Sequence, residues 1–189
     1  MIEITDKKDA VETMKKLGLN YFPLDVFDVN DIEGIKKFFK KYPASEYVLR
    51  NADKAGGKFF FVSSFEEALP LLQNFQEKVT IDVSYNPYKE DIVLVGDVKV
   101  TKDGFQDMID LIARDDEEGT NRNVYENPKY NLHTTLDDEK LWKIPGFTKL
   151  MDYISRHELY NMIVEFIVYD CKLGIKKENV VIAEIRTDY

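Results

Sequence analysis

Two glutamates near the end of the chain lie inside apolar, β-prone runs, Glu165 in Val-Glu-Phe and Glu184 in Val-Ile-Ala-Glu-Ile. Burying a lone carboxylate among such side chains is unfavourable unless a partner compensates for it. If the two runs pair as neighbouring strands with both acids on one face, the carboxylates can hold a hard divalent cation. Mg²⁺ is commonly held by one or two carboxylates, with water and substrate phosphates completing its shell. The pattern predicts phosphate chemistry; the alternative is that both acids face solvent on half-exposed strands.

A glycine-rich turn, Gly56-Gly57-Lys58, separates two predicted strands at residues 47–50 and 59–62. Glycines let backbone N–H groups approach an anion closely, and a lysine adds positive charge. The alternative is an ordinary hairpin turn with a solvated lysine. The chain contains neither the Walker phosphate-binding loop nor a Gly-x-Gly-x-x-Gly dinucleotide motif, so those two nucleotide-binding folds are not expected.

Length, charge and cysteine content restrict the class of protein. The 189 residues suit one large domain or two small subdomains. A net charge of −9 argues against general binding to nucleic acid. The single cysteine, Cys171, rules out an intrachain disulfide framework and fits a reducing cytosol. No run approaches the ~20 apolar residues of a membrane span, and residues 1–6 lack the pattern of a signal peptide. These features predict a cytoplasmic protein without a membrane partner.

The hydrophobic pattern alternates helices with hairpins rather than repeating βαβ units, which favours an α+β fold. Cap and breaker signals predict helices at residues 6–17 with Thr5 or Asp6 as the cap, at residues 32–42 with Asn30 or Asp31 as the cap, after Ser63 or Ser64, and at residues 147–157. Further strands are expected at residues 79–85 and 92–100 and on both sides of residues 170–179. Residues 105–113 could form a helix or a strand, and residues 114–136 are the least regular stretch.

Three blocks of sequence follow one another along nearly the whole chain. The first is Asp-Lys opening a helix, followed by Gly-Leu-Asn-Tyr-Phe-Pro at residues 18–23. The second is a strand ending in Arg50, the diglycine turn, a second strand and a Ser-capped helix. The third is the pair of closing strands, one with Glu-Phe and one with Glu-Ile-Arg. In this order the blocks resemble the ATP-grasp family.

The resemblance implies nucleotide-binding roles for the basic residues. Lys7 would reach an ATP phosphate from the first helix, and Arg50 stands where the family has a second phosphate-binding lysine. Gly56, Gly57 and Lys58 would form the mobile lid over the triphosphate.

The resemblance also implies roles for acidic residues and for Arg186. Glu165 and Glu184 would hold Mg²⁺, and Asp82 is the candidate on the adenine side. Arg186 stands at the family's metal-ligating Asn; a guanidinium cannot ligate a cation but could pair with a phosphate or with Glu184. Apart from the resemblance, Arg114 and Arg122 flank the acidic run at residues 115–118; they could bind a substrate carboxylate bidentately, or only satisfy that acidic run.

The resemblance implies a compact ATP-grasp-like domain over residues 1–189, without the family's separate N-terminal domain. It would consist of antiparallel sheets with flanking helices, forming two subdomains around a cleft. Residues 20–78 would form the small lid subdomain, and residues 79–189 would bind the metal and the nucleotide.

The implied activity is that of an ATP- and Mg²⁺-dependent ligase. A small carboxylate substrate would be activated as an acyl phosphate and attacked by an amine or thiol. The alternative is a non-catalytic ATP-grasp-derived module for binding or assembly in a larger complex. A homo-oligomer or a partner protein is compatible with the sequence.

Overall fold

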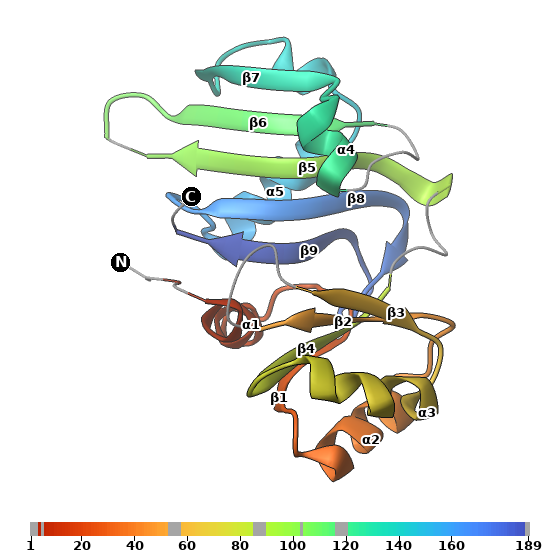
Figure 1. Ribbon diagram of the computed structural model, residues 1–189. Coiled ribbons are helices and arrows are strands. Elements are labelled where there is room, and N and C mark those ends of the chain that lie inside the picture. The colour runs from red at the N-terminus through yellow and green to blue at the C-terminus, as the bar shows by residue number, and fades with distance from the viewer. Residues whose placement is uncertain are drawn as a thin grey trace.

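Two antiparallel sheets, each with its own helices, make up the chain in the computed structural model (Figure 1). The structure describes Ile4 and residues 6–52, 58–84, 90–102, 104–115 and 121–187. Within these ranges no helix is long and apolar enough to cross a membrane. The α+β class with antiparallel sheets and flanking helices is therefore confirmed.

The smaller sheet has four strands. In bonded order they are β1 (Leu24–Asp28), β4 (Lys78–Val83), β2 (Tyr47–Asn51) and β3 (Phe59–Val62). One face packs against α2 (Ile32–Lys41), α3 (Phe65–Ala68) and the 3₁₀ helix η1 (Leu69–Asn74). Asp31 caps α2 by accepting from the Gly34 N–H at 2.9 Å. The boundary expected between the two subdomains lies between residues 78 and 79. This sheet crosses that boundary, because it includes β4.

The larger sheet has five strands. In bonded order they are β7 (Tyr130–Thr135), β6 (Met108–Arg114), β5 (Ile92–Thr101), β8 (Ile163–Leu173) and β9 (Glu178–Arg186). Residues 105–113, which could have been a helix, thus contribute the strand β6. The stretch 114–136 contains α4 (Asn121–Glu126) and β7, so it has more regular structure than its sequence predicts.

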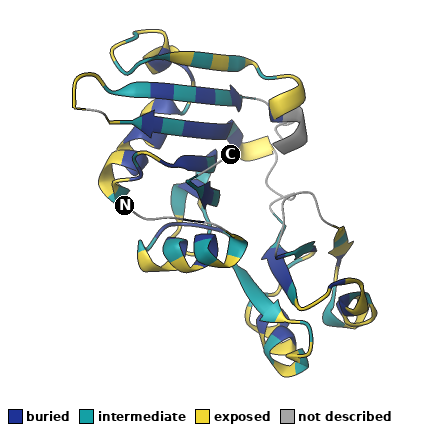
Figure 2. Cartoon of the chain, turned by 60° about the vertical axis from the view of Figure 1, so that its left-hand side comes forward, coloured by how far each residue is buried: buried dark blue, intermediate teal, exposed yellow. Residues whose placement is uncertain are grey.

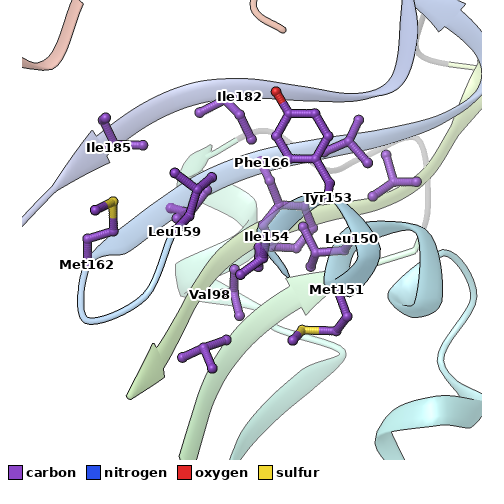
Figure 3. Close-up of a cluster of buried hydrophobic side chains, with 14 of the residues drawn as sticks. Val98, Leu150, Met151, Tyr153, Ile154, Leu159, Met162, Phe166, Ile182 and Ile185 are labelled. Atoms are coloured by element: carbon purple, nitrogen blue, oxygen red, sulfur yellow. The ribbon is translucent and has the colours of Figure 1, made fainter. Parts of the chain in front are cut away.

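The main core lies between one face of the larger sheet and α5 (Phe147–His157), which the 3₁₀ helix η3 (Leu141–Lys143) precedes. Figure 3 shows Tyr153 and Ile154 of α5 close to Phe166 and Ile182 of the strands, with Ile185 further along β9. All five of these side chains are almost completely buried. Figure 2 shows the same contrast along the chain, with buried strand positions beside exposed outer faces of the helices.

The helix α1 (Lys7–Lys16) lies beside both sheets (Figure 1) and contacts β1 as well as β9. Asp6 caps it by accepting from the Asp9 N–H at 2.8 Å, as the sequence predicts for this position. Its apolar stripe of Ala10, Val11 and Met14 is buried in the main core. The N-terminus of α1, and Lys7 with it, is thereby held where the two sheets meet.

A buried asparagine fixes the turn between β8 and β9 to the segment after α1. Asn20 is 0% exposed. Its Nδ2 donates to the carbonyl oxygens of Leu173 and Val180 at 2.9 and 2.7 Å, and its Oδ1 accepts from the Lys176 N–H at 2.8 Å. Buried backbone groups need such partners. These bonds therefore hold the closing hairpin, which carries the two glutamates of interest.

Candidate functional site

Three carboxylates form a row across the centre of the larger sheet. Asp97 on β5 is the register partner of Glu165 on β8, and Glu165 is the register partner of Glu184 on β9. Directly opposed residues of antiparallel strands project from the same face, with Cβ atoms about 4.5–5.5 Å apart. The geometric expectation that the two glutamates share one face is therefore confirmed, and Asp97 extends the pair to three.

A β-bulge gives Glu184 this orientation. Phe166 pairs with Ile182 and Glu165 pairs with Glu184, so Ala183 is an extra residue on β9. Ile182 and Ile185 both point into the main core beneath α5, although they are three residues apart. A regular strand would send Ile182 and Glu184 to the same face, because side chains alternate with a period of two. The bulge turns Glu184 to the face opposite α5, beside Glu165.

Charged groups of the two sheets interact electrostatically at this face. The pKa of Lys7 is lowered by burial and by Arg50, against opposing effects of Glu184, Asp82 and Glu165. Lys7 begins α1, while Arg50 and Asp82 belong to the smaller sheet. The site is therefore assembled from both sheets and the start of α1.

Burial in this region also raises the pKa of a carboxylic acid side chain. Glu165 has its pKa raised to about 7, first by burial and then by the neighbouring charges of Asp97 and Glu184, while Arg50 and Arg186 act in the opposite direction. A bound divalent cation would remove this unfavourable crowding of negative charge.

Arg50 on β2 forms an ion pair with Asp82 on β4. Asp82 is only 8% exposed, so its carboxylate is held inside the sheet face rather than in water. Phe59 and Phe61 on the edge strand β3 share this face, because they are register partners of Arg50 and Val48. Their rings stack edge to face at 5.7 Å and are 60% and 58% exposed. The smaller sheet thus presents an arginine and two aromatic rings towards the site.

Arg186 contacts the third carboxylate of the row. Its guanidinium reaches from β9 past β8 and donates to Asp97 on β5. Tyr125 of α4 also donates to Asp97, and Arg186 Nη2 lies 2.9 Å from the Tyr125 hydroxyl. Burial raises the pKa of Asp97, while the hydrogen bond from Tyr125 and the charge of Arg186 lower it. The pairing of Arg186 is therefore with Asp97, not the alternative pairing with Glu184 considered from the sequence.

A second cluster of buried apolar side chains lies on the same face as the carboxylate row. Its members come from β5, β8 and β9, with one residue of α4 beside them: Ile92, Val95, Ile167, Tyr169, Val181 and Val124. These side chains are buried within the chain, so the row of acids lies next to packed core.

The other predicted site residues lie as follows. Gly56 and Gly57 fall outside the described residues, and Lys58 is exposed at the start of the β3 segment. Arg114 donates to the carbonyl of Asn127 at 2.5 Å. The carboxylate of Asp115 next to it accepts from Lys129 at 2.6 Å. Whether Arg114 binds a substrate carboxylate stays a prediction.

Sequence reasoning missed Asp97 and Tyr125. Asp97 carries the signal used for the two glutamates, since it is an acid within the apolar run Leu-Val-Gly-Asp-Val of β5. Tyr125 has no such signal, because its role depends on how α4 packs beside the sheet. Among the described residues, no group of three or more His, Cys, Asp or Glu side chains is arranged to hold a metal ion. Any cation must therefore complete its shell with water or a ligand.

Comparison with known proteins identifies the fold. No family model and no curated protein matches the chain. Among solved structures it is similar to D-alanine-D-alanine ligase from Helicobacter pylori, with 11% identity over 96% of this chain and 50% of that one and a TM-score of 0.54. It is also similar to N5-carboxyaminoimidazole synthase from Aspergillus clavatus in complex with ADP and 5-aminoimidazole ribonucleotide, with 11% identity, 97% and 44% coverage and a TM-score of 0.54. A further match is carboxyaminoimidazole ribonucleotide synthase from Aspergillus clavatus complexed with ATP, with 14% identity, 96% and 44% coverage and a TM-score of 0.53.

These similar structures are ATP-grasp enzymes. The chain therefore has the ATP-grasp fold, as its ordered motifs predicted. It spans about half the length of the structures that it matches.

The residues present fit a nucleotide phosphate chain with Mg²⁺. Glu165 and Glu184 supply hard oxygen donors from opposed strand positions, which is the kind of ligand that Mg²⁺ prefers. Lys7 and Arg50 supply positive charge that acts on both glutamates.

Proposed function

We propose that the protein binds ATP and Mg²⁺ where its two sheets meet, and that it acts as a ligase of ATP-grasp type. In the proposed reaction the terminal phosphoryl group passes to a small carboxylate substrate and ADP leaves. An amine or thiol then attacks the acyl phosphate and releases phosphate. The observation that carries the proposal is that Glu165 and Glu184 are opposed on one face of the larger sheet, close enough to Lys7 and Arg50 for their charges to interact.

Each of these side chains has a role that follows from its charge. Lys7 and Arg50 would neutralise phosphate oxygens, and this charge stabilisation and positioning are most of what a protein contributes to phosphoryl transfer. Glu165 and Glu184 would hold Mg²⁺, which when bound neutralises charge on the phosphates. Asp82 would keep Arg50 oriented towards the site through its ion pair.

The hairpin of β2 and β3 would serve as the lid. Gly56, Gly57 and Lys58 would cover the phosphates with backbone N–H groups and one cation. Phe59 and Phe61 follow directly and expose their rings on the site-facing side. Closing such an apolar surface over the site would keep water from hydrolysing an acyl phosphate.

Thermal melting with a non-hydrolysable ATP analogue tests the binding claim. A ligand at 100 times its dissociation constant adds about 2.7 kcal/mol of stability, which raises the Tm of a chain of this size by roughly 5–11 °C. The double variant Glu165→Gln/Glu184→Gln should lose the part of the shift that depends on Mg²⁺. The matched control is Glu139→Gln, which changes an exposed glutamate in a turn. No shift at millimolar nucleotide would rule the proposal out.

A non-catalytic binding module is the second candidate. It is favoured by the two arginines of the site, since Arg50 and Arg186 are each already paired with a buried aspartate. Phosphate release separates the two functions when it is measured across a panel of small carboxylates with amines or thiols. A ligase gives release that depends on both substrates and disappears in Glu165→Gln/Glu184→Gln, whereas a module gives a melting shift without release. In a ligase, Arg114→Gln should raise KM for the carboxylate substrate if Arg114 binds it.

A further inference from the structure

The row of Asp97, Glu165 and Glu184 has oxygen donors for more than one cation. The three side chains project from adjacent strands on one face. Two-metal sites place their ions about 3.5–4 Å apart. Asp97 would be the additional ligand for a second ion beside Glu165, although among the described residues no group of three such side chains is arranged to hold a metal ion as the site stands.

The carboxylate of Asp97, at one end of this row, already has hydrogen-bond donors from the protein. Its carboxylate accepts from both Tyr125 and Arg186, and Asp97 is 5% exposed. Removing one partner from a buried ion pair is strongly unfavourable, because the remaining charge is left without compensation. Asp97 is therefore bound to protein donors and is not available as a metal ligand while Arg186 stays in place.

The guanidinium of Arg186 lies beside the central member of the row. It starts on β9 and ends at Asp97 on β5, so it passes β8, the strand that carries Glu165. The charges of Arg186 and Glu165 also attract each other. A positive charge thus already occupies the side of Glu165 where a second cation would bind between Asp97 and Glu165.

We propose that this site takes one divalent cation, held by Glu165 and Glu184, and that Arg186 stands in the place of a second. Asp97 and Tyr125 are positioning residues that hold the guanidinium towards the phosphates of the nucleotide. This inference rests on the proposed function, because it assumes that a nucleotide brings its phosphates to the row.

Counting Mn²⁺ ions in the complex with a non-hydrolysable ATP analogue tests the proposal. Electron paramagnetic resonance of free Mn²⁺ during titration gives the number bound per protein–nucleotide complex. We expect one ion for the unmodified protein and two for Arg186→Asn, since this change frees Asp97 and adds an amide oxygen. Arg186→Lys and Tyr125→Phe should both keep one ion, because each leaves a positive charge beside Asp97.

Two ions in the unmodified protein would overturn the inference and leave the proposed function standing, whereas absence of nucleotide binding would overturn both. One ion in a folded Arg186→Asn variant would also overturn the inference. If that variant does not fold, Asp97→Asn/Arg186→Asn removes the unpaired carboxylate as well as the guanidinium. We expect one ion in it and nucleotide affinity about tenfold weaker or more, from loss of a charge-assisted contact. Unchanged affinity there would refute the role of Arg186.

Discussion

Replacing Asn20 by alanine should destabilise the protein strongly, although Asn20 touches none of the proposed ligands. The side chain is 0% exposed and makes three hydrogen bonds of 2.7–2.9 Å to the turn between β8 and β9. Alanine removes the partner of the Leu173 and Val180 carbonyl oxygens and of the Lys176 N–H. Val180 is buried and Leu173 half-buried, whereas Lys176 is exposed. A hydrogen bond contributes about 1 kcal/mol net, and an unsatisfied buried group costs about 1–3 kcal/mol. We therefore expect a loss of about 3 kcal/mol or more.

Thermal melting measures this loss directly. For a chain of this size 1 kcal/mol corresponds to roughly 2–4 °C, so Asn20→Ala should lower the Tm by roughly 6–12 °C. The matched control is Asn74→Ala, which changes an exposed asparagine bonded to the carbonyl of Leu71 at 3.0 Å, and its Tm should fall by about 2 °C at most. If the two variants melt within 2 °C of each other, water replaces the lost bonds of Asn20 and the reasoning fails.

Two more changes test the electrostatics and the packing of the larger sheet. The pKa of Glu165 is raised from 4.5 to about 7, so the folded state binds more protons in that range and stability should fall as pH rises from 5 to 8. Urea denaturation should show a shallower decline for Glu165→Gln, and equal declines in both proteins would contradict the assigned burial. In Gly96→Ala the new Cβ would lie 2.1 Å from the Ile112 carbonyl oxygen, so β5 and β6 must separate at about 1–3 kcal/mol. Asn131→Ala, at an exposed position of the neighbouring strand β7, is the comparison in thermal melting, and an equal loss in the two variants would show that the sheet yields easily.

Local signals in the sequence predicted the helices well. Asp6, Asp31 and Ser64 were each expected as one of two possible caps, and each caps its helix in the structure. Capping depends on a side chain reaching an N–H group three residues away, so it can be read without knowing the fold. The pairing of Glu165 with Glu184 was also predictable, because consecutive strands with a short connection pair as a hairpin.

Features that depend on tertiary packing could not be predicted in this way. Residues 105–113 stayed ambiguous because a short apolar run fits a helix or a strand equally well. Asp97 was overlooked although its run resembles those of the two glutamates, and only the strand order places β5 next to β8. The partner of Arg186 could not be read from spacing, since its side chain reaches beyond the neighbouring strand.

The extra residue Ala183 has a consequence for sequence variation in this hairpin. In a regular strand, inserting or deleting one residue exchanges the faces of everything beyond it. The bulge already absorbs one extra residue, so β9 is exempt from this at position 183. Without Ala183, Glu184 would follow Ile182 directly, and alternation would still direct Glu184 to the side of Glu165 and Ile185 into the core beneath α5. In sequences of this fold, a one-residue gap at this point therefore keeps the opposed acids, whereas a gap elsewhere in β9 would separate them.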